Sequence, residues 1–581
     1  MGQQLTKRNV TDRTLEYWEE KPGYWCYIDE LLGEELKAAK NDNPRRLQGV
    51  GRPVHTLALT VGESFEPLLQ TICVLRPQRI ILILNQRYGN KKGKEYGHDL
   101  SQLILYLVGN PNLPEEFRPQ LSKKDIQIRE LPADSPTQVF RTLLEEFQKS
   151  EAQPPAGYTN VVDITGAKKS MIAGAFFYAA HSGLPITYVD FDKYDPDWRR
   201  PYGYTCKIGQ IANPYEAFHL RDWEQVRRLY ESYSFRNALA MLGKDETSGI
   251  RGAMAWKIDD TAGEPLFEKS DRDKVTVVAR LFEMYEAWEN GDYALAKQMR
   301  DSFNPRLPDD VVPWSIDELG DIWPSVALTV TANQAALELL NKHLALKQGL
   351  SKQGSSSPAD SLFAQPKRLL AYVRDELAKI ERLIEKNEDY RSAYLRAAAL
   401  EEFLLKARLC ISWLNNSLDI EIGNNPPVTV FTLSQTDQID GFKNLVEHSG
   451  ADSMRNTLAR GSRLNLKQAG MKVRLGSNAP SLHPYWSGTT LDIDVVQHGS
   501  TPCFTKLRGE AIHTHLYLPR SIAEAALELV RAAVDEFERN WLEHFHPGIL
   551  ANTQNKVIAA PAWPRLCEVC ELTFLPPRLR S

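Results

Sequence analysis

The chain has 581 residues, of which 42% are hydrophobic and 25% charged, with 34 glycines and 34 prolines. This composition is typical of folded globular proteins and excludes disordered, collagen-like and coiled-coil chains, while the length predicts two to four domains. The net charge of -5 gives no overall attraction to nucleic acid or to an anionic membrane, so any polyanion has to be bound by a local patch.

The cysteines and the N-terminal segment bear on the cellular compartment. Seven cysteines, an odd number, are scattered along the chain, so we expect free thiols and no disulfide framework. Residues 1–21 contain no apolar leader segment, and the longest aliphatic run, at 80–84, is far too short to span a bilayer. We therefore expect a cytoplasmic protein that does not insert into membranes.

Short apolar runs alternate with helical segments in the first third of the chain. The first organised segment is expected after the Gly-Arg-Pro punctuation at 51–53, which leaves residues 1–50 as an N-terminal extension. Uniformly apolar strands are covered on both faces, so we expect a Rossmann-like α/β domain with a parallel, doubly wound sheet over residues 51–215. The predicted strands are 55–61, 79–85, 126–131, 159–165 and 185–191.

The hydrophobic period changes to that of helices from about residue 220. We expect a helical domain at 216–346, a linker rich in Gly and Ser at 347–365, a second helical domain at 366–550 and an irregular, Pro-rich tail at 551–581. Residues 425–505 are rich in loops, with strand-like stretches at 428–433 and 491–496.

A turn at the end of the first predicted strand, TVGES at 60–64, carries candidate ligand residues. Gly62 permits a tight turn, and Ser64 opens the next helix, where its hydroxyl either caps the helix or donates to a phosphate. Ligands of open α/β sheets bind at the carboxyl ends of the strands, which is where this turn lies.

A second turn, DITGAKKSM at 163–171, follows the fourth predicted strand. Thr165 and Gly166 end the strand, and Lys168 and Lys169 open a helix, so positive charge is added to the positive end of the helix dipole. This arrangement suits an anionic ligand, although a solvated polar turn is the alternative. The spacing is not that of a P-loop, so nucleotide hydrolysis by that route is not predicted.

These two turns resemble the ligand motifs of CARF domains, the Rossmann-like sensors of cyclic oligoadenylates among CRISPR-associated proteins. The second family motif is roughly D-x-T-G-G-T-K-x-M, and Ala167 and Lys168 stand where the family has Gly and Thr. The residues in register are Asp163, Thr165, Gly166, Lys169 and Met171. The resemblance covers residues 51–215 and implies that cyclic oligoadenylate is bound by Gly62, Ser64, Thr165, Gly166, Lys168, Lys169 and Met171. Asn85 and Arg87 follow the second strand and are expected at the rim, on position alone.

The family resemblance also implies an effector domain, most often a HEPN ribonuclease with an R-x4-6-H motif. Arg508 and His513 match this motif, with His515 two residues further on, and Arg539 and His544 form a second copy. We prefer the first copy because a long amphipathic helix follows it, as in the family. The helical segment 388–409 also resembles one that precedes the catalytic region in CARF-HEPN proteins of type III CRISPR systems.

The resemblance implies a metal-independent endoribonuclease of antiviral defence that cuts single-stranded RNA. Cyclic oligoadenylate would act as its allosteric activator, and no cofactor would be required. A His for proton transfer and an Arg for the charged phosphorane suffice for attack by the substrate's own 2'-hydroxyl, which leaves 2',3'-cyclic phosphate ends. A homodimer would double this site. The alternative is a sensor or adaptor without catalytic activity, or a ring nuclease that degrades its ligand.

Three further motifs suggest metal sites, and we weigh each against a simpler explanation. Cys567 and Cys570 form a single C-x-x-C pair, so a zinc site would need ligands from elsewhere. The H-x-H at 513–515 is followed by too few residues to build a hydrolase barrel. Asp492 and Asp494 are not followed by a lysine at the spacing that a metal-dependent nuclease motif requires, so they are better explained as solvated residues at a strand edge. We therefore expect no metal site.

Overall fold

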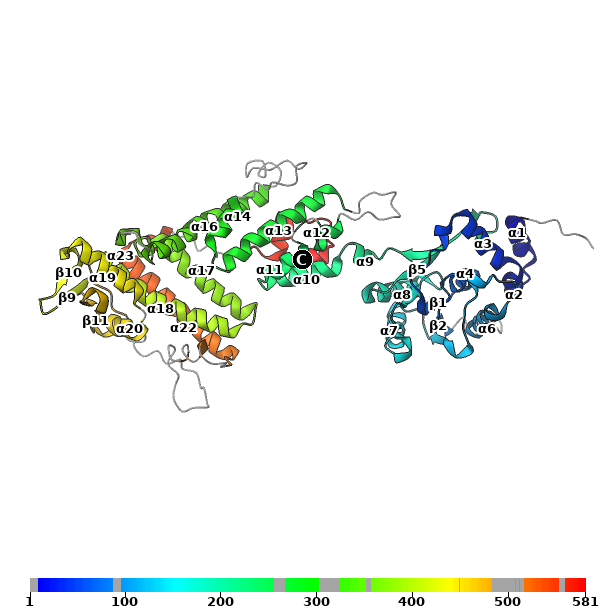
Figure 1. Cartoon of the computed structure of the whole chain (residues 1–581), viewed down its shortest axis with the longest axis horizontal. Helices are drawn as coiled ribbons and strands as arrows, with labels where there is room; N and C mark the ends of the chain where they lie inside the picture. Colours follow the sequence, from blue (N-terminus) through cyan, green and yellow to red (C-terminus); the bar gives the residue numbers. More distant parts are fainter. Residues whose placement is uncertain are drawn as a thin grey trace, which may run out of the picture. The chain divides into compact units, whose positions relative to one another are not determined.

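The computed structural model describes residues 9–86, 96–243, 245, 247–254, 267–301, 324–351, 357–448, 450–482, 507, 511–512, 517–552 and 560–581. The chain divides into two compact units, Met1–Arg221 and Asp222–Ser581 (Figure 1). Within the described ranges, none of the helices combines the length and the apolar character that crossing a bilayer requires.

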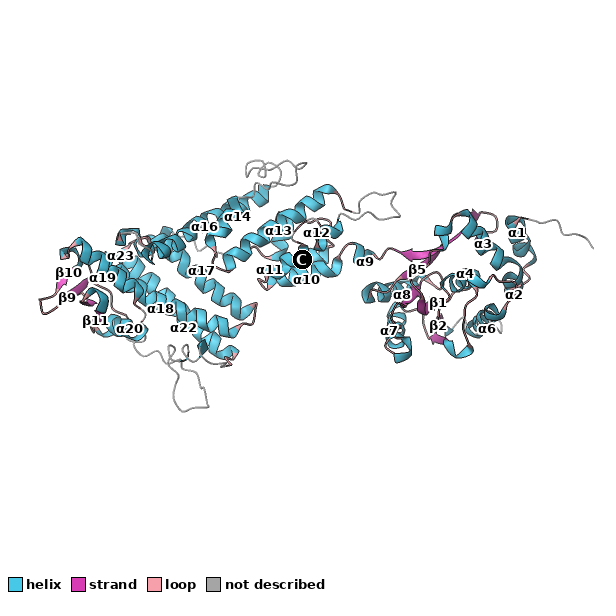
Figure 2. Ribbon diagram, viewed as in Figure 1, coloured by secondary structure: helices cyan, strands magenta, loops and turns pink. Residues whose placement is uncertain are grey.

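A six-stranded sheet forms the centre of the first unit (Figure 2). Its order is β3-β2-β1-β4-β5-β8, and β8 runs antiparallel to β5 whereas the other neighbours are parallel. The strands are β1 Val54–Thr60, β2 Arg79–Asn85, β3 Ile126–Leu131, β4 Thr159–Asp163, β5 Ile186–Phe191 and β8 Cys206–Ile211. The five predicted strands are confirmed. β8 was not predicted because only alternate residues of this edge strand are buried.

Helices cover both faces of the sheet. Leu57 and Leu59 of β1 pack with α4 (Glu66–Leu75) and α6 (Tyr96–Gly109). Ala58, on the opposite side of the same strand, packs with α7 (Pro136–Phe147) and α8 (Lys169–Ser182). This is the doubly wound arrangement that the apolar strands predict.

The N-terminal extension belongs to the sheet unit, which differs from the expected start of organised structure after residue 50. It forms α1 (Val10–Glu20), α2 (Tyr24–Cys26), the π-helical η1 (Tyr27–Leu32) and α3 (Gly33–Asp42). Tyr27, Leu32 and Leu36 are buried in the same core as Leu57. The short helices are rich in charge and carry few apolar residues each, so their periodicity is weak in the sequence.

The second unit is mainly helical. Its longer helices are α10 Leu220–Glu231, α11 Phe235–Leu242, α13 Lys269–Glu289, α14 Tyr293–Asp301, α16 Pro324–Ser351, α17 Pro366–Glu385, α18 Tyr390–Leu414, α19 Gln435–Glu447, α20 Ala451–Arg460 and α22 Arg520–Glu536. The expected linker differs from the structure. α16 continues to Ser351, and Leu362 and Phe363 are buried in the core shared with α17 and α18.

A small antiparallel sheet of order β10-β9-β12-β11 lies within this unit. Its strands are β9 Leu418–Ile422, β10 Val428–Thr429, β11 Leu464–Leu466 and β12 Met471–Leu475. Of the strand-like stretch 428–433, only the first two residues are a strand. The stretch 491–496, with Asp492 and Asp494, lies outside the described residues.

The C-terminal tail is folded where the structure describes it, contrary to the expected irregular segment. It contains α25 (Trp563–Val569) and α26 (Pro577–Arg580). Trp563 is buried, and its Nε1 donates to the carbonyl oxygen of Leu579 at 2.6 Å. The hydroxyl of Tyr230 in α10 donates to the carbonyl oxygen of Pro561 at 2.6 Å. These long-range contacts fix a segment that has no clear period in the sequence.

The C-x-x-C pair lies inside this folded tail. Cys567 and Cys570 are buried free thiols, and burial raises the pKa of Cys567 to about 12. Among the described residues, no three His, Cys, Asp or Glu side chains gather as a metal ion would need.

Candidate functional site

The two candidate turns meet at the carboxyl edge of the parallel sheet. β1 and β4 are adjacent and parallel, with Leu59 opposite Asp163, so the turns that follow them lie at the same edge. β1 pairs with β2 on its other side. The strand order therefore reverses between β1 and β4, and such a switch point is where open α/β sheets bind ligands.

The backbones of the two turns touch at two glycines. A Cβ placed on Gly166 would lie 2.2 Å from the carbonyl oxygen of Thr60, and one on Gly62 would lie 2.7 Å from the backbone nitrogen of Ala167. The Thr60 hydroxyl also donates to the carbonyl oxygen of Gly166 at 2.6 Å. Glycine is therefore required at both positions by close packing, which makes the two turns one structural element.

The buried carboxylate of Asp163 shapes the second turn. Its Oδ1 accepts from the backbone N–H of Thr165 at 3.0 Å, and its Oδ2 accepts from the Thr187 hydroxyl at 2.9 Å. The Thr165 hydroxyl oxygen in turn accepts from the backbone N–H of Val189 at 2.9 Å. Burial raises the pKa of Asp163 to about 6. Asp163 is a positioning residue, because its hydrogen bonds fix the turn to β5.

Ala167 occupies a conformation that favours glycine. Its φ is +77°, in the left-handed region that L side chains rarely adopt. Glycine adopts this conformation without strain, and glycine is the residue that the D-x-T-G-G-T-K-x-M motif has at this position. The strain comes from the Cβ, which alanine carries and glycine lacks.

The two lysines of the second turn have different surroundings. Lys168 forms an ion pair with Asp134, with Nζ 2.5 Å from Oδ2, and Asn85 donates to Oδ1 of the same carboxylate. Lys169 is exposed, is the first residue of α8, and has no ion pair with any described residue. Lys169 is therefore the cation of this turn that an anionic ligand can reach without breaking a pair.

The Ser64 hydroxyl does not cap a helix. The N-cap of α4 is Phe65, without a side-chain hydrogen bond. Ser64 is exposed, and within the described part of the chain its hydroxyl has no hydrogen-bond partner. Of the two roles open to it in the sequence, the donor to a ligand is the one that this geometry permits.

Met171 is the one candidate ligand residue that lies away from the surface. It is fully buried in the core between α8 and the sheet, so it supports the turn from below and does not reach a ligand at the surface. Asp134 was missed from the sequence. It follows β3 by three residues and precedes the Ser-Pro that opens α7, so its position after a strand was the available signal. Arg87 lies outside the described residues.

The preferred catalytic residues Arg508, His513 and His515 also lie outside the described residues. Two described residues within the same segment, Leu507 and Ala511, are buried in the core of the second unit. Arg391, at the start of α18, donates from Nη2 to the carbonyl oxygen of Ala511 at 2.7 Å. α18 therefore contacts Ala511, a described residue between the two halves of this copy of the motif.

The second copy of the motif lies on the surface. Arg539 is exposed and forms an ion pair with Asp535 at 2.8 Å, and His544 is exposed with its ring edge-on to Phe545. Arg539 lies within a π-helical turn, Phe537–Leu542, and His544 lies in the short helix that follows it, α23 (Glu543–Phe545).

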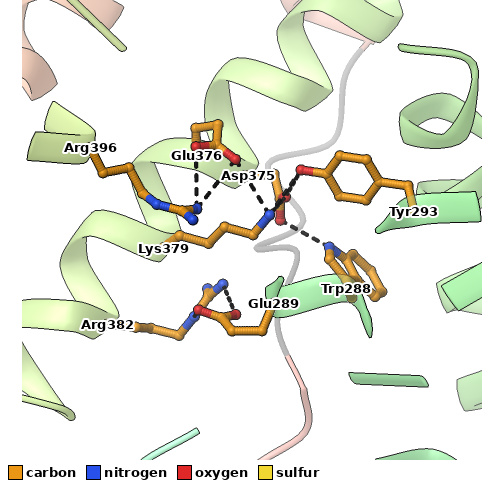
Figure 3. Close-up of polar contacts among 8 residues, drawn as sticks. All are labelled: Trp288, Glu289, Tyr293, Asp375, Glu376, Lys379, Arg382 and Arg396. Atoms are coloured by element: carbon orange, nitrogen blue, oxygen red, sulfur yellow. Dashed lines mark hydrogen bonds and ion pairs between the residues drawn. The ribbon is translucent and has the colours of Figure 1, made fainter. Parts of the chain in front are cut away.

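A buried charge network lies elsewhere in the second unit (Figure 3). Asp375 and Lys379 of α17 are both fully buried, with Nζ 2.8 Å from Oδ2. The Tyr293 hydroxyl donates to Asp375 Oδ2 at 2.6 Å, and Trp288 Nε1 donates to Oδ1 at 3.0 Å. Both oxygens of the Asp375 carboxylate thus accept a hydrogen bond from a neighbouring side chain, which indicates a structural role.

Two further ion pairs lie beside these residues, as Figure 3 shows. Arg396 of α18 pairs with Glu376 at 3.3 Å, and Arg382 pairs with Glu289 of α13 at 2.6 Å. These pairs connect α13, α17 and α18. The network therefore joins helices on both sides of the expected linker into one unit.

Comparison with known proteins gives one match to a characterised relative, and no protein-family model matches the chain. Over 200 residues the chain is 26% identical to the CRISPR system endoribonuclease Csm6 of Thermus thermophilus. The match takes in 33% of this chain and 37% of the relative, so it spans little more than a third of that protein's length.

Two solved structures show distant likeness. The first, Enterococcus italicus Csm6 bound to cyclic hexa-2'-fluoro-hexa-dAMP, has 11% identity and a TM-score of 0.33, over 89% of this chain and 100% of that one. The second, Can2 from Sulfobacillus thermosulfidooxidans in complex with cyclic tetra-adenylate, has 14% identity and a TM-score of 0.18, over 43% of this chain and 69% of that one.

Proposed function

We propose that this chain is a cyclic-oligoadenylate-activated endoribonuclease of type III CRISPR defence. In this proposal the first unit is a CARF sensor, and a HEPN-like domain in the second unit cuts single-stranded RNA without a metal ion. The main support for the proposal is the close backbone contact between the Gly62 turn and the Gly166 turn, where the strand order reverses between β1 and β4. Ser64 and Lys169 project polar groups there that the described residues leave unpaired.

The chemistry of this edge suits a phosphate of the ligand. The Lys168 side chain makes no cap at the start of α8, and although the backbone N–H of Met171 donates to the Lys168 carbonyl oxygen, those of Lys169 and Ser170 remain available to an anion. Lys169 adds a cation and Ser64 a hydroxyl donor. A cyclic ligand with rotational symmetry also matches a twofold dimer, which presents the same half-site twice, and we propose a homodimer for this reason.

We assign RNA cleavage to Arg508 and His513. Support comes from two described neighbours in the sequence, Leu507 and Ala511, which are buried in the core of the second unit, and from Arg391, which donates to the carbonyl oxygen of Ala511. Arg539 in the other copy is already paired with Asp535. The sequence identity with the endoribonuclease Csm6 supports the activity without extending to the whole of that protein.

An RNA cleavage assay tests the proposal. Full-length protein is incubated with labelled single-stranded RNA and EDTA, with no activator, cyclic tetra-adenylate or cyclic hexa-adenylate. Cleavage that needs one of the rings and leaves 2',3'-cyclic phosphate ends is the expected result. Ring binding without cleavage would instead indicate a sensor or adaptor. Conversion of the ring to linear adenylates would indicate a ring nuclease.

A matched pair of lysine variants tests the sensor site. Lys169→Ala should weaken ring binding on the order of tenfold, since an ion pair or charged hydrogen bond to a ligand phosphate is lost. Lys123→Ala is the control, because Lys123 is equally exposed but precedes β3 at the opposite edge of the sheet. Equal ring affinity in the two variants would contradict the assignment of this edge.

A further inference from the structure

A cleft of about 520 Å³ lies at the amino edge of the parallel sheet, within the first unit. Val54 begins β1, Gln78 immediately precedes β2 and Tyr158 immediately precedes β4, and all three line the cleft. Because β1 is parallel to β2 and to β4, these strands begin at one edge, which is opposite to the edge of the Ser64 and Lys169 turns. The volume falls within the range of about 300–1,000 Å³ that is usual for small-molecule sites.

Three arginines give this cleft its charge, and we call it the arginine cleft. Arg52, Arg76 and Arg118 line it, and none of the described residues in its lining is an Asp or a Glu. Arg52 and Arg76 are exposed, and neither makes an ion pair with a residue that the structure describes. The net charge of the whole chain is -5, so three cations without a carboxylate form a local positive patch that attracts an anion.

The third arginine of the cleft is held in place by neutral acceptors. Arg118 donates from Nε to the carbonyl oxygen of Leu113 at 2.6 Å and from Nη2 to that of Pro111 at 3.1 Å. These carbonyl oxygens orient the guanidinium group and leave it with its full positive charge. Glu116, two residues before Arg118, forms an ion pair with Lys40. The charge of Arg118 therefore remains available to a ligand.

Backbone hydrogen bonds fix the walls of the arginine cleft. The N–H and the carbonyl oxygen of Gly49 each make a hydrogen bond of 3.1 Å to β8. The carbonyl oxygen of Pro53 accepts from the N–H of Thr159 in β4 at 3.0 Å, and the N–H of Gln78 donates to the carbonyl oxygen of Val54 at 3.2 Å. The cleft is thus formed before a ligand arrives, which lowers the entropic cost of binding.

The uncharged side chains of the arginine cleft suit a nucleoside. Tyr158 is half-buried in the lining and has an aromatic ring on which a base can stack. Three exposed glutamines also line the cleft, Gln48, Gln78 and Gln120. Each amide carries both a donor and an acceptor, so it can pair with a base edge or with a sugar hydroxyl.

We propose that the arginine cleft binds a nucleoside polyphosphate. Its phosphates contact Arg52, Arg76 and Arg118, and its base stacks on Tyr158. A guanidinium group presents paired N–H donors that match phosphate oxygens, and three such groups suit a chain of phosphates with several negative charges. This site is separate from the proposed ring site and does not depend on it.

Binding of ATP to the full chain, measured by calorimetry in EDTA, tests the proposal. ATP should bind more tightly than AMP, on the order of tenfold or more, and adenosine should bind most weakly, because each phosphate removed loses charged hydrogen bonds. Inorganic triphosphate should bind more weakly than ATP, since it has no base to stack on Tyr158. Equal affinities for ATP and AMP, or for ATP and inorganic triphosphate, would overturn the proposal.

Arg76→Gly separates ligand binding from folding. Arg76 ends α4 with φ +45°, in the left-handed region, so glycine there should leave the stability unchanged or raise it. ATP affinity should nevertheless fall on the order of tenfold, because a charged contact to phosphate is lost. Lys21→Gly is the matched control, since Lys21 is an exposed cation that ends α1 with φ +50° and does not line the cleft. Equal ATP affinity in the two variants would overturn the proposal.

A second pair of variants distinguishes the two edges of the sheet. Arg52→Ala should weaken ATP binding and leave the affinity for cyclic tetra- and hexa-adenylate unchanged, whereas Lys169→Ala should leave ATP binding unchanged. Loss of ATP binding in Lys169→Ala, with retention in Arg52→Ala, would locate ATP at the glycine turns and overturn the proposal. A chain that binds ATP in this way but neither ring would contradict the proposed function and leave this inference intact.

Discussion

The Cα of Gly166 lies so close to the carbonyl oxygen of Thr60 that a Cβ would come within 2.2 Å of it. This contact joins the turn after β1 to the turn after β4 and fixes the positions of Ser64 and Lys169 relative to each other. The properties of the candidate site therefore depend on a backbone contact as much as on its polar side chains.

Gly166→Ala should separate the two turns. The clash is with backbone and cannot be relieved by a side-chain rotation, so we expect a loss of about 2 kcal/mol of stability and a large loss of ring affinity. Urea unfolding and ring-binding titrations measure the two effects. Gly109→Ala is the matched control, since no atom lies within 4 Å of a Cβ there. Unchanged ring affinity in Gly166→Ala would contradict the site.

Ala167→Gly should be neutral or stabilising, unlike most alanine-to-glycine changes. It relieves a left-handed conformation that costs an L residue roughly 1 kcal/mol, and this gain offsets the extra entropy of glycine in the unfolded chain. Ala133→Gly, at an exposed loop position without a positive φ, should lower the free energy of unfolding. A similar loss in both variants, by urea unfolding, would contradict the assigned conformation.

Asp163 should make stability depend on pH between about pH 4 and pH 6. Its folded-state pKa of about 6 lies above the ordinary value near 3.9, so the folded chain binds more protons than the unfolded chain in this window. The free energy of unfolding therefore falls as the pH rises through it, by up to roughly 3 kcal/mol.

Asp163→Asn removes this titration. From pH 4 to pH 6 the free energy of unfolding of the original chain should therefore fall relative to that of the variant. Above pH 6 the difference should become constant. Asp190→Asn, on the exposed side of β5, should retain the slope. A difference that does not vary with pH would contradict the burial of the Asp163 carboxylate.

Lys379→Met should destabilise the second unit by about 3 to 5 kcal/mol. The substitution leaves the Asp375 carboxylate buried without its cation, and an uncompensated buried charge is costly. Lys367→Met, at an exposed position near the start of the same helix, should change stability by less than about 0.5 kcal/mol. In a double-mutant cycle, adding Asp375→Asn to Lys379→Met should recover part of the lost stability. Additive effects of the two substitutions would contradict the Asp375–Lys379 ion pair.

His513→Ala should reduce RNA cleavage on the order of 100-fold or more, because a positioned acid-base group contributes that much. Ring affinity should change little, since the proposed sensor site lies in the first unit. His544→Ala is the matched control from the other copy of the motif. Loss of cleavage in His544→Ala with retention in His513→Ala would assign the proposed active site to Arg539 and His544.

The strands, their order along the chain and both glycine turns could be predicted from the sequence because each depends on local signals. Apolar runs of strand length, interrupted by Gly and polar residues, are sufficient to locate β1 to β5 and the turns that follow β1 and β4. The sequence alone was therefore sufficient to name four candidate residues in these turns, Ser64, Thr165, Gly166 and Lys169.

Only the tertiary structure decided which distant segments meet. The pairing of Asp134 with Lys168, the arginine cleft, the packing of the tail on α10 and the Asp375 network all join segments far apart in sequence. Such contacts leave no local period, because each depends on where the chain returns after folding. The sequence alone thus determined the sheet and its turns, whereas long-range packing decided which side chains at those turns are paired and which remain available to a ligand.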